Sequence, residues 1–357
     1  MENKLIKHLD VHVERNLLVT EISLNDMNVA AEYAFYIFRN QERIHVEWYT
    51  KNSKFEFDTK GDPGCYRIQA FVKSDKESEN SFSKYIFANP VNVSKSEFGS
   101  KENKDHLFYN LVGEKWEIPA LFYPDDKKAL FVLMPSAVDR KRMSLPAFNR
   151  WTWAKEGVFP GNILCISDPT LELHDDLALG WCLGNSKSCA TQELAGFVIA
   201  LAESMDIPNE KIVIYGSSAG GFAALALSSL IEGSIAIAIN AQTEAFSYSI
   251  TSQVDLVSES CFSMPKDSAK NTFRDRLNMA DRWSTVEYSR AILLQNILDD
   301  HHYDVHFKPF WNSLGGEPEV EGFSSSGRHL AWVYRQEGGH VPETIDMAKK
   351  VIDWIGI

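Results

Sequence analysis

A serine between two glycines lies where an apolar strand-like run gives way to a helix-like run. Residues 211–215 are mostly apolar and β-branched, the segment Gly216-Ser217-Ser218-Ala219-Gly220 follows, and residues 222–227 favour a helix. This order is typical of a nucleophile elbow, a sharp turn that raises a serine hydroxyl out of a sheet. Glycines two residues before and after the serine leave the room that such a turn requires. We therefore predict Ser218 as a nucleophile, with the backbone N–H of Ala219 as an oxyanion donor at the start of the helix.

An elbow serine reacts only when a base takes its proton and an acid orients that base. In folds with this elbow the chain order is serine, then aspartate or glutamate, then histidine, each after a later strand. Residues 291–296 predict a buried strand that is followed by Asp299 and Asp300. Residues 330–335 predict the last strand, and two glycines and His340 come soon after it. We predict His340 as the base and favour Asp299 over Asp300 as the acid because of its distance from the strand end.

The second oxyanion donor is expected in the loop after an earlier strand. Residues 129–134 have the composition of that strand and run into Pro135-Ser136-Ala137. The backbone N–H of Ser136 or of Ala137 is the candidate, and we choose Ser136.

Three histidines follow the predicted acid closely, namely His301, His302 and His306. Such a cluster can indicate a metal site, but no cysteine or carboxylate pair at ligand spacing accompanies it. We interpret these histidines as polar groups that flank the acid loop, and we expect no bound metal.

Aromatic and charged residues follow the first two predicted strands of this part of the chain, on the side where an active site would lie. Aromatic faces can stack on sugar rings, and Asp or Arg can bind sugar hydroxyls. We predict a saccharide site from these residues, with the alternative that Trp151 and Trp153 simply pack in the core: Arg150, Trp151, Trp153, Asp168 and Trp181.

Composition limits the classes of function. The chain has 357 residues, 44% of them hydrophobic and 24% charged, as is usual for a globular protein. A formal net charge of −13 disfavours a nucleic-acid partner, since phosphate binding needs a basic face. No apolar run is long enough to predict a membrane span, and the first residues lack the apolar core of a secretion signal. Five cysteines without paired spacing favour a reducing compartment, and we expect a cytoplasmic protein.

The pattern of hydrophobic residues predicts two domains. Residues 1–100 show short alternating strands separated by turns, which indicates a small antiparallel β-sandwich, and 95–105 have the polar composition of a linker. Residues 107–357 alternate apolar strands with helices, which predicts an α/β-hydrolase fold with a mostly parallel sheet covered by helices on both faces. The interval 242–290 is longer than a simple crossover, and we expect it to form a cap over the site.

Several short motifs together resemble a bacterial group, the α/β-hydrolase-like proteins encoded in capsular and other surface-polysaccharide loci. They lie within residues 125–345, in this order: Pro146–Trp151, Ile166–Thr170, Gly180-Trp181, Tyr215–Phe222, Asn240–Thr243, and Gln295-Asn296 with Asp299, His302 and Tyr303. Asn240-Ala241-Gln242 departs from the Asn-Pro-Gln expected there, a difference in loop rigidity.

The resemblance implies acyl chemistry on a glycan or glycan precursor, related in kind to polysaccharide O-acetyltransferases and esterases. It implies no cofactor, apart from an acyl donor such as acetyl-CoA as a co-substrate. Motif spacing does not separate hydrolysis from transfer. The alternative is a non-catalytic assembly or binding protein of a capsule-biosynthesis machine that retains the fold. In either case the amino-terminal domain could contact other polysaccharide-biosynthesis proteins.

Overall fold

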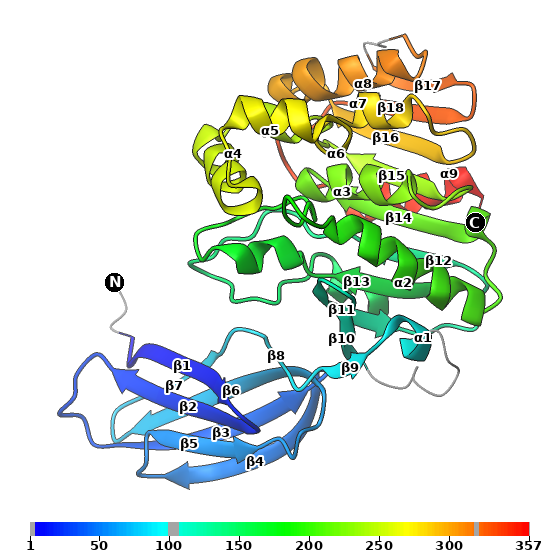
Figure 1. Ribbon diagram of the computed structural model, residues 1–357. Helices are drawn as coiled ribbons and strands as arrows, with labels where there is room; N and C mark the ends of the chain where they lie inside the picture. Colours follow the sequence, from blue (N-terminus) through cyan, green and yellow to red (C-terminus); the bar gives the residue numbers. More distant parts are fainter. Residues whose placement is uncertain (1–3, 99–106, 318–320, 357) are drawn as a thin grey trace. The chain divides into compact units, whose positions relative to one another are not determined.

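The computed structural model describes residues 4–98, 107–317 and 321–356 (Figure 1). The chain divides into two compact units, one of Met1–Val91 with His106–Tyr109 and one of Asn92–Asp105 with Asn110–Ile357. The main division therefore lies before the polar segment that we predicted as a linker. In that segment Lys95–Phe98 form the short helix α1, and residues 99–105 lie outside the described part of the chain.

The first unit consists of two antiparallel sheets, with the strand orders β1-β2-β5 and β4-β3-β6-β7, and β8 pairs with β6. The strands are β1 (Ile6–Glu14), β2 (Leu17–Leu24), β3 (Ala31–Arg39), β4 (Glu42–Thr50), β5 (Lys54–Asp58), β6 (Gly64–Ser74), β7 (Ser78–Phe82) and β8 (Ile86–Ala88). Alternate side chains of both sheets enter one core, in which Leu18, Phe35 and Ile68 are fully buried. The alternation in the sequence thus corresponds to one buried face per strand.

The largest sheet has ten strands in the order β17-β18-β16-β15-β14-β12-β13-β11-β10-β9, and those from β11 to β18 lie entirely in the second unit. Its strands are β9 (Val91–Val93), β10 (Phe108–Val112), β11 (Glu117–Tyr123), β12 (Leu130–Leu133), β13 (Asn162–Ile166), β14 (Ile212–Ser217), β15 (Ile235–Ile239), β16 (Arg290–Asn296), β17 (Gly322–Ser326) and β18 (His329–Tyr334). The strands from β13 through β12, β14, β15 and β16 to β18 are parallel, whereas β11 and β17 pair antiparallel at either side. The central strands are buried along their whole length, as the continuous apolar runs predict.

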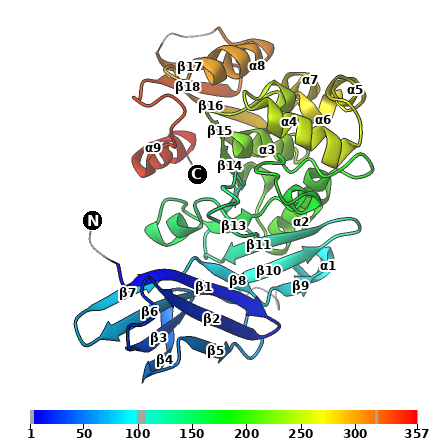
Figure 2. The ribbon, with the colours of Figure 1, turned by 90° about the vertical axis from the view of Figure 1, so that its left-hand side faces the viewer.

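Helices cover both faces of this sheet, with α9 (Ile345–Ile355) on one face and α2 (Ala190–Ser204) and α3 (Ala219–Ser228) on the other (Figure 2). Short helical turns occur at Trp151–Glu156, Pro169–Leu173 and Asn209–Lys211. A further helix, α8 (Lys308–Ser313), follows a π-helical turn at His302–Phe307.

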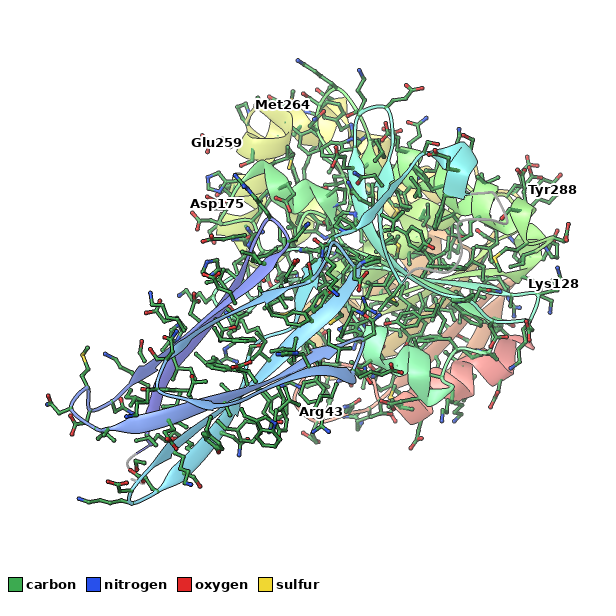
Figure 3. All side chains as sticks on the ribbon, turned by 90° about the horizontal axis from the view of Figure 1, so that it is seen from below. Arg43, Lys128, Asp175, Glu259, Met264 and Tyr288 are labelled. Carbon is green, nitrogen blue, oxygen red and sulfur yellow. The ribbon has the colours of Figure 1, made fainter. Side chains whose placement is uncertain are left out.

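The long interval after β15 folds into short helices. These are turns at Ala245–Ser247 and Ser258–Phe262, with α4 (Thr251–Val257), α5 (Lys266–Thr272), α6 (Arg274–Leu277) and α7 (Met279–Trp283). Their apolar side chains, among them Phe246, Leu277 and Trp283, share a core with Phe222 of α3 and Trp311 of α8. Exposed side chains such as Glu259 lie on the outside of the insert (Figure 3).

No helix in the described part of the chain is both long and apolar enough to span a membrane. The five cysteines are unpaired, and Cys65 and Cys165 are buried hydrophobes as expected. Burial raises the pKa of the Cys65 thiol to about 12.

Candidate active site

Ser218 lies at a strained turn between β14 and α3. Its backbone has φ 53° and ψ −121°, a conformation that L-residues rarely adopt. A Cβ added to Gly216 would overlap the carbonyl group of Gly220, and one added to Gly220 would lie 3.0 Å from the Met134 and Pro135 oxygens. Both glycines are therefore required by close backbone approach, and the turn presents the Ser218 hydroxyl at the carboxyl ends of the parallel strands.

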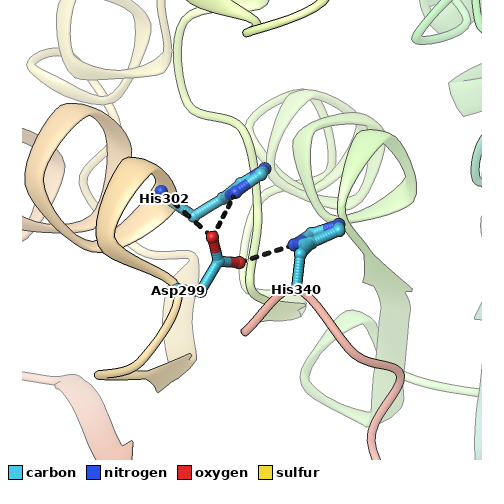
Figure 4. Close-up of side chains that lie close together, drawn as sticks. All are labelled: Asp299, His302 and His340. Atoms are coloured by element: carbon cyan, nitrogen blue, oxygen red, sulfur yellow. Dashed lines mark hydrogen bonds and ion pairs between the residues drawn. The ribbon is translucent and has the colours of Figure 1, made fainter. Parts of the chain in front are cut away.

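The structure brings Ser218, His340 and Asp299 together from three separate segments. His340 Nε2 lies 3.0 Å from Ser218 Oγ, and His340 Nδ1 lies 2.6 Å from Asp299 Oδ2 (Figure 4). Asp299 is 6% exposed, whereas Asp300 is exposed to solvent. This is the geometry of a serine, a base and an orienting carboxylate.

A second histidine is hydrogen-bonded to the other oxygen of the Asp299 carboxylate. His302 Nδ1 lies 3.0 Å from Asp299 Oδ1 (Figure 4), and its Nε2 lies 3.0 Å from Gln242 Nε2. Gln242 Nε2 also donates to Ser218 Oγ at 2.9 Å, and Gln242 Oε1 accepts from Trp181 Nε1 at 3.0 Å. The serine oxygen thus has a second polar partner that the sequence did not predict.

The environment of Asp299 favours its charged form. Burial alone would raise the pKa of this carboxyl, but the hydrogen bonds from His302 and His340 lower the pKa well below its usual range. Asp299 is therefore ionised at neutral pH and can stabilise an imidazolium on His340.

Two asparagines at strand ends hold the loop that carries His340. Asn296 Nδ2 donates to the carbonyl oxygens of Gln336 and Gly339, at 2.7 Å each. Asn240 Nδ2 donates to the Val341 carbonyl at 3.3 Å, and its Oδ1 accepts from the Asn296 N–H at 2.7 Å. These bonds fix the backbone on both sides of His340 to the ends of β15 and β16.

A pocket of about 400 Å³ opens beside Ser218 and His340. Its lining includes Arg150 and Trp153, together with Ala137 and Asn149 from the loop after β12. The pocket therefore joins Ser218 to an aromatic ring and a cluster of polar side chains.

Arg150 forms a buried ion pair at this pocket. Its Nε and Nη2 donate to the two oxygens of Glu343 at 2.5 and 2.6 Å, and Nη2 donates to Ser217 Oγ at 2.7 Å. The Tyr215 hydroxyl donates to Glu343 Oε1 at 2.6 Å. Burial would lower the pKa of Arg150, but the Glu343 charge and hydrogen bonds raise it. The guanidinium is consequently charged, and the carboxylate of Glu343 balances its charge.

Three of the predicted saccharide-binding residues do not line this pocket. Trp151 is 9% exposed, and Trp181 is buried with its indole N–H on Gln242. Asp168 is also buried, and its carboxylate caps the turn at Pro169–Leu173 by accepting hydrogen bonds from the Thr170 and Cys182 N–H groups. The sequence prediction was therefore wrong for these three as ligand contacts, because strand-end position alone does not distinguish a loop residue that packs inward from one that faces the site.

The predicted oxyanion donors differ in their availability. Ala219 is the first residue of helix α3 and directly follows Ser218, so its N–H lies at the amino-terminal end of the helix. The Ser136 N–H donates to Asn149 Oδ1 at 2.9 Å, so that in this structure it is already engaged. The alternative, Ala137, lines the pocket. Of these two candidates we therefore prefer Ala137.

The long interval 242–290, which we expected to form a cap, contributes no residue to the described lining of this pocket. Its apolar residues pack against α3 and α8 instead, and only Gln242, at its beginning, reaches the serine.

The histidine cluster lies at the acid loop, as expected. Asp299, His302 and His340 offer ligand atoms within 4.8 Å of one another. A metal bound to both Asp299 Oδ2 and His340 Nδ1 at about 2.1 Å each would hold them at least about 3 Å apart. Their 2.6 Å separation is that of a hydrogen bond. In this structure Asp299 and His340 therefore share a hydrogen bond.

Glu343 and Gln242 are the site residues that the sequence analysis missed. Gln242 lies in the Asn240-Ala241-Gln242 segment, whose position directly after a central strand was an available signal. Glu343 lies three residues after His340, and nothing local distinguishes it from a solvated carboxylate. Its partner, Arg150, is 193 positions away in the chain.

No protein-family model matches this sequence, and no curated protein matches it. Its fold is similar to that of the capsule O-acetyltransferase of Neisseria meningitidis serogroup A, with a TM-score of 0.51 and 15% sequence identity over 70% of this chain and 93% of that chain. It is also similar to the Glycosylation Associate Protein (Gap123) complex from Streptococcus agalactiae, with a TM-score of 0.52 and 11% identity over 98% of this chain and 69% of that chain. At such identities the similarity shows the fold.

Proposed function

We propose that this protein is a serine-dependent acyltransferase or esterase that acts on a glycan or glycan precursor. The observation that carries the proposal is the aligned set Ser218 Oγ, His340 Nε2 and Nδ1, and Asp299 Oδ2, at 3.0 and 2.6 Å. The fold shared with a capsule O-acetyltransferase supports the choice of acyl chemistry on a polysaccharide.

In the proposed reaction Ser218 Oγ attacks the acyl carbonyl carbon and gives its proton to His340 Nε2. The tetrahedral oxyanion would accept from the Ala219 N–H and the Ala137 N–H, and each such donor is worth about 2.7–4 kcal/mol. The tetrahedral intermediate then collapses: the bond from the acyl carbon to the leaving group breaks, His340 gives its proton to that group, and the acyl–Ser218 ester remains. A sugar hydroxyl or water attacks this ester in the second step, loses its proton to His340, and releases Ser218.

The pocket supports a saccharide as the acyl acceptor or ester. Trp153, whose ring also contacts Arg150 and Phe159, presents part of its indole to the pocket, where it can contact a sugar ring. The Arg150–Glu343 pair offers polar atoms to hydroxyl groups without a net charge. An acyl donor such as acetyl-CoA is compatible with this site only if its phosphates lie outside the pocket, because the one cation of the described lining, Arg150, is already paired.

The alternative function is a non-catalytic assembly role. The similarity in fold to the Glycosylation Associate Protein complex is the observation that favours this alternative. The first unit would then be the contact region for other polysaccharide-biosynthesis proteins. Trp48, 67% exposed on β4, is a suitable contact residue there.

Labelling with a fluorophosphonate separates the two functions. We expect the purified protein to be labelled and the adduct to map to Ser218. Ser218→Ala should abolish labelling and p-nitrophenyl acetate turnover, whereas the exposed Ser186→Ala should retain both. An unlabelled wild-type protein that is folded by circular dichroism would favour the assembly role.

A further inference from the structure

We propose that Gln242 is a catalytic residue that donates a hydrogen bond to the nucleophile oxygen throughout the reaction, and that His302 positions it. This inference rests on the proposed function, because it concerns the same serine. It goes beyond a three-residue triad, since it adds a second hydrogen-bonded route between Ser218 and Asp299.

The two routes form a closed ring. From Ser218 Oγ the first passes through His340 to Asp299 Oδ2, and the second passes through Gln242 and His302 to Asp299 Oδ1. Every separation along this ring lies between 2.6 and 3.0 Å, within hydrogen-bond range.

The orientation of the Gln242 amide is fixed from both of its ends. The Trp181 indole can only donate, so the atom that it contacts must be the amide oxygen, Gln242 Oε1. The nitrogen of the amide therefore faces His302 Nε2 and Ser218 Oγ, and it has one N–H for each. Because Trp181 is 1% exposed and Gln242 fully buried, solvent does not compete for these bonds.

This orientation assigns the tautomer of His302. Its Nε2 must accept from Gln242, so its single proton lies on Nδ1 and is donated to Asp299 Oδ1. A protonated His302 would turn an N–H toward the amide N–H groups and break the ring.

The surroundings of His302 oppose that protonation. The titratable groups that face it are Asp299, His340, His301 and His306. Burial lowers the pKa of His302, and positive charge on His340 or His301 would lower it further, although Asp299 acts in the opposite sense.

The ring also fixes the direction of the reactive proton. Since Gln242 Nε2 can only donate, Ser218 Oγ accepts from it and must point its own hydrogen at His340 Nε2. As that proton moves to His340, negative charge grows on Oγ and the Gln242 bond strengthens. In the second step the acyl–Oγ bond breaks, its electron pair stays on Oγ, and the proton returns from His340 Nε2. Gln242 then stabilises the leaving oxygen and gives up no proton.

Three variants of the full-length protein test this role. We expect Gln242→Leu and Gln242→Glu to slow fluorophosphonate labelling of Ser218, and the kcat for p-nitrophenyl acetate, by about tenfold or more, with a smaller change in KM. Glutamate keeps the shape but replaces the donor by an acceptor. Gln253→Leu is the matched control, because the Gln253 amide is likewise hydrogen-bonded at both of its ends, to backbone groups outside the site, and this variant should react as the wild type does.

His302→Phe tests His302 through the pH profile of kcat/KM, which would not change if the role of His302 were purely structural. Phenylalanine keeps a flat ring beside His340 but removes the hydrogen bond to Asp299 Oδ1. The carboxylate then acts on His340 alone, so we expect the acid limb of the kcat/KM profile to move to higher pH as well as a lower rate.

The outcomes separate this inference from the proposed function. Wild-type protein that does not label at Ser218 would overturn both. If the wild type is labelled and Gln242→Glu is labelled at the same rate, the role of Gln242 alone is overturned. If the acid limb of the kcat/KM profile stays at the same pH in His302→Phe, the role of His302 is overturned. Circular dichroism of each variant excludes loss of folding as the cause of a slower rate.

Discussion

The imidazole rings of His302 and His340 lie face to face, with centroids 4.1 Å apart and planes inclined by 14° (Figure 4). Both rings direct Nδ1 to one carboxylate, that of Asp299. Two positive charges about 4 Å apart repel by about 4 kcal/mol at the effective dielectric constant of a protein surface. The stack therefore carries at most one positive charge. Because His302 stays neutral, that charge lies on His340 when His340 takes the serine proton.

Asp299→Asn should lower kcat/KM by about 10⁴-fold, because the amide cannot hold His340 in the tautomer that accepts the serine proton. Asp300→Asn is the matched control, since Asp300 is the exposed neighbour, and it should stay within about twofold of the wild type. Ester hydrolysis measured on both variants decides the assignment. Equal loss in the two variants would contradict it.

Local patterns predicted the parts of this site that depend on local backbone. These parts are the elbow at Ser218 and the two parallel strands that precede Asp299 and His340. Each can be recognised from a short pattern in the sequence: the spaced glycines of the elbow and the apolar runs of the strands. The Arg150–Glu343 pair and the Gln242 contact could not be predicted, since they join segments that only the folded sheet brings together. The cap was expected from the length of 242–290, and length does not show that the aromatic residues of this interval pack against α3 and α8.

Arg150→Met should destabilise the protein by about 3–5 kcal/mol, since it leaves Glu343 buried without its partner. The double variant Arg150→Met/Glu343→Leu should recover much of this loss. Urea unfolding of the single and double variants measures the coupling. Arg335→Met, which breaks the exposed Arg335–Glu321 pair, should change stability by less than about 1 kcal/mol. A similarly small effect at Arg150 would mean that the pair is not buried in solution.

Acidification should weaken the fold through His306. This histidine is fully buried, and burial and the nearby histidines lower its pKa to about 3. An unfolded-state histidine takes up its proton near pH 6.5, so the stabilisation is present above that pH and is lost as the pH falls toward 3. Between pH 7 and pH 5 the free energy of unfolding should drop by about 2 kcal/mol from this group.

His306→Asn tests this pH dependence, because asparagine keeps an acceptor for the Thr243 N–H but does not titrate. Urea unfolding at pH 7 and pH 5 should show a shallower decline in the variant. The same decline in both proteins would rule out His306 as a source.

Removal of the first unit should succeed at residue 92 and fail at residue 105. A fragment from residue 92 onward loses Val91, the first residue of β9, but keeps α1, whose Phe98 packs against Phe122 and Phe197. A fragment from 105 onward loses this contact and exposes both rings. We expect the longer fragment to be soluble and labelled at Ser218, and the shorter one to aggregate or unfold at a lower temperature. A longer fragment that folds but does not label would show that the first unit contributes to the reaction.

The substrate should be a short acyl group on a saccharide, because the pocket beside Ser218 is lined by polar side chains such as Asn149 as well as by one aromatic ring, Trp153. A lipase instead needs a broad apolar mouth. Hydrolysis of acetyl, butyryl and palmitoyl esters should decline steeply with chain length, and acetyl transfer to capsular oligosaccharides should be detectable. Trp153→Ala should raise the KM for the oligosaccharide by about tenfold and affect p-nitrophenyl acetate much less, since stacking on one aromatic ring contributes about 1 kcal/mol or more. Trp48→Ala, an exposed tryptophan in the first unit, is the control and should leave both values unchanged. A rate that rises with chain length through palmitoyl would contradict the saccharide proposal and leave the serine chemistry untouched.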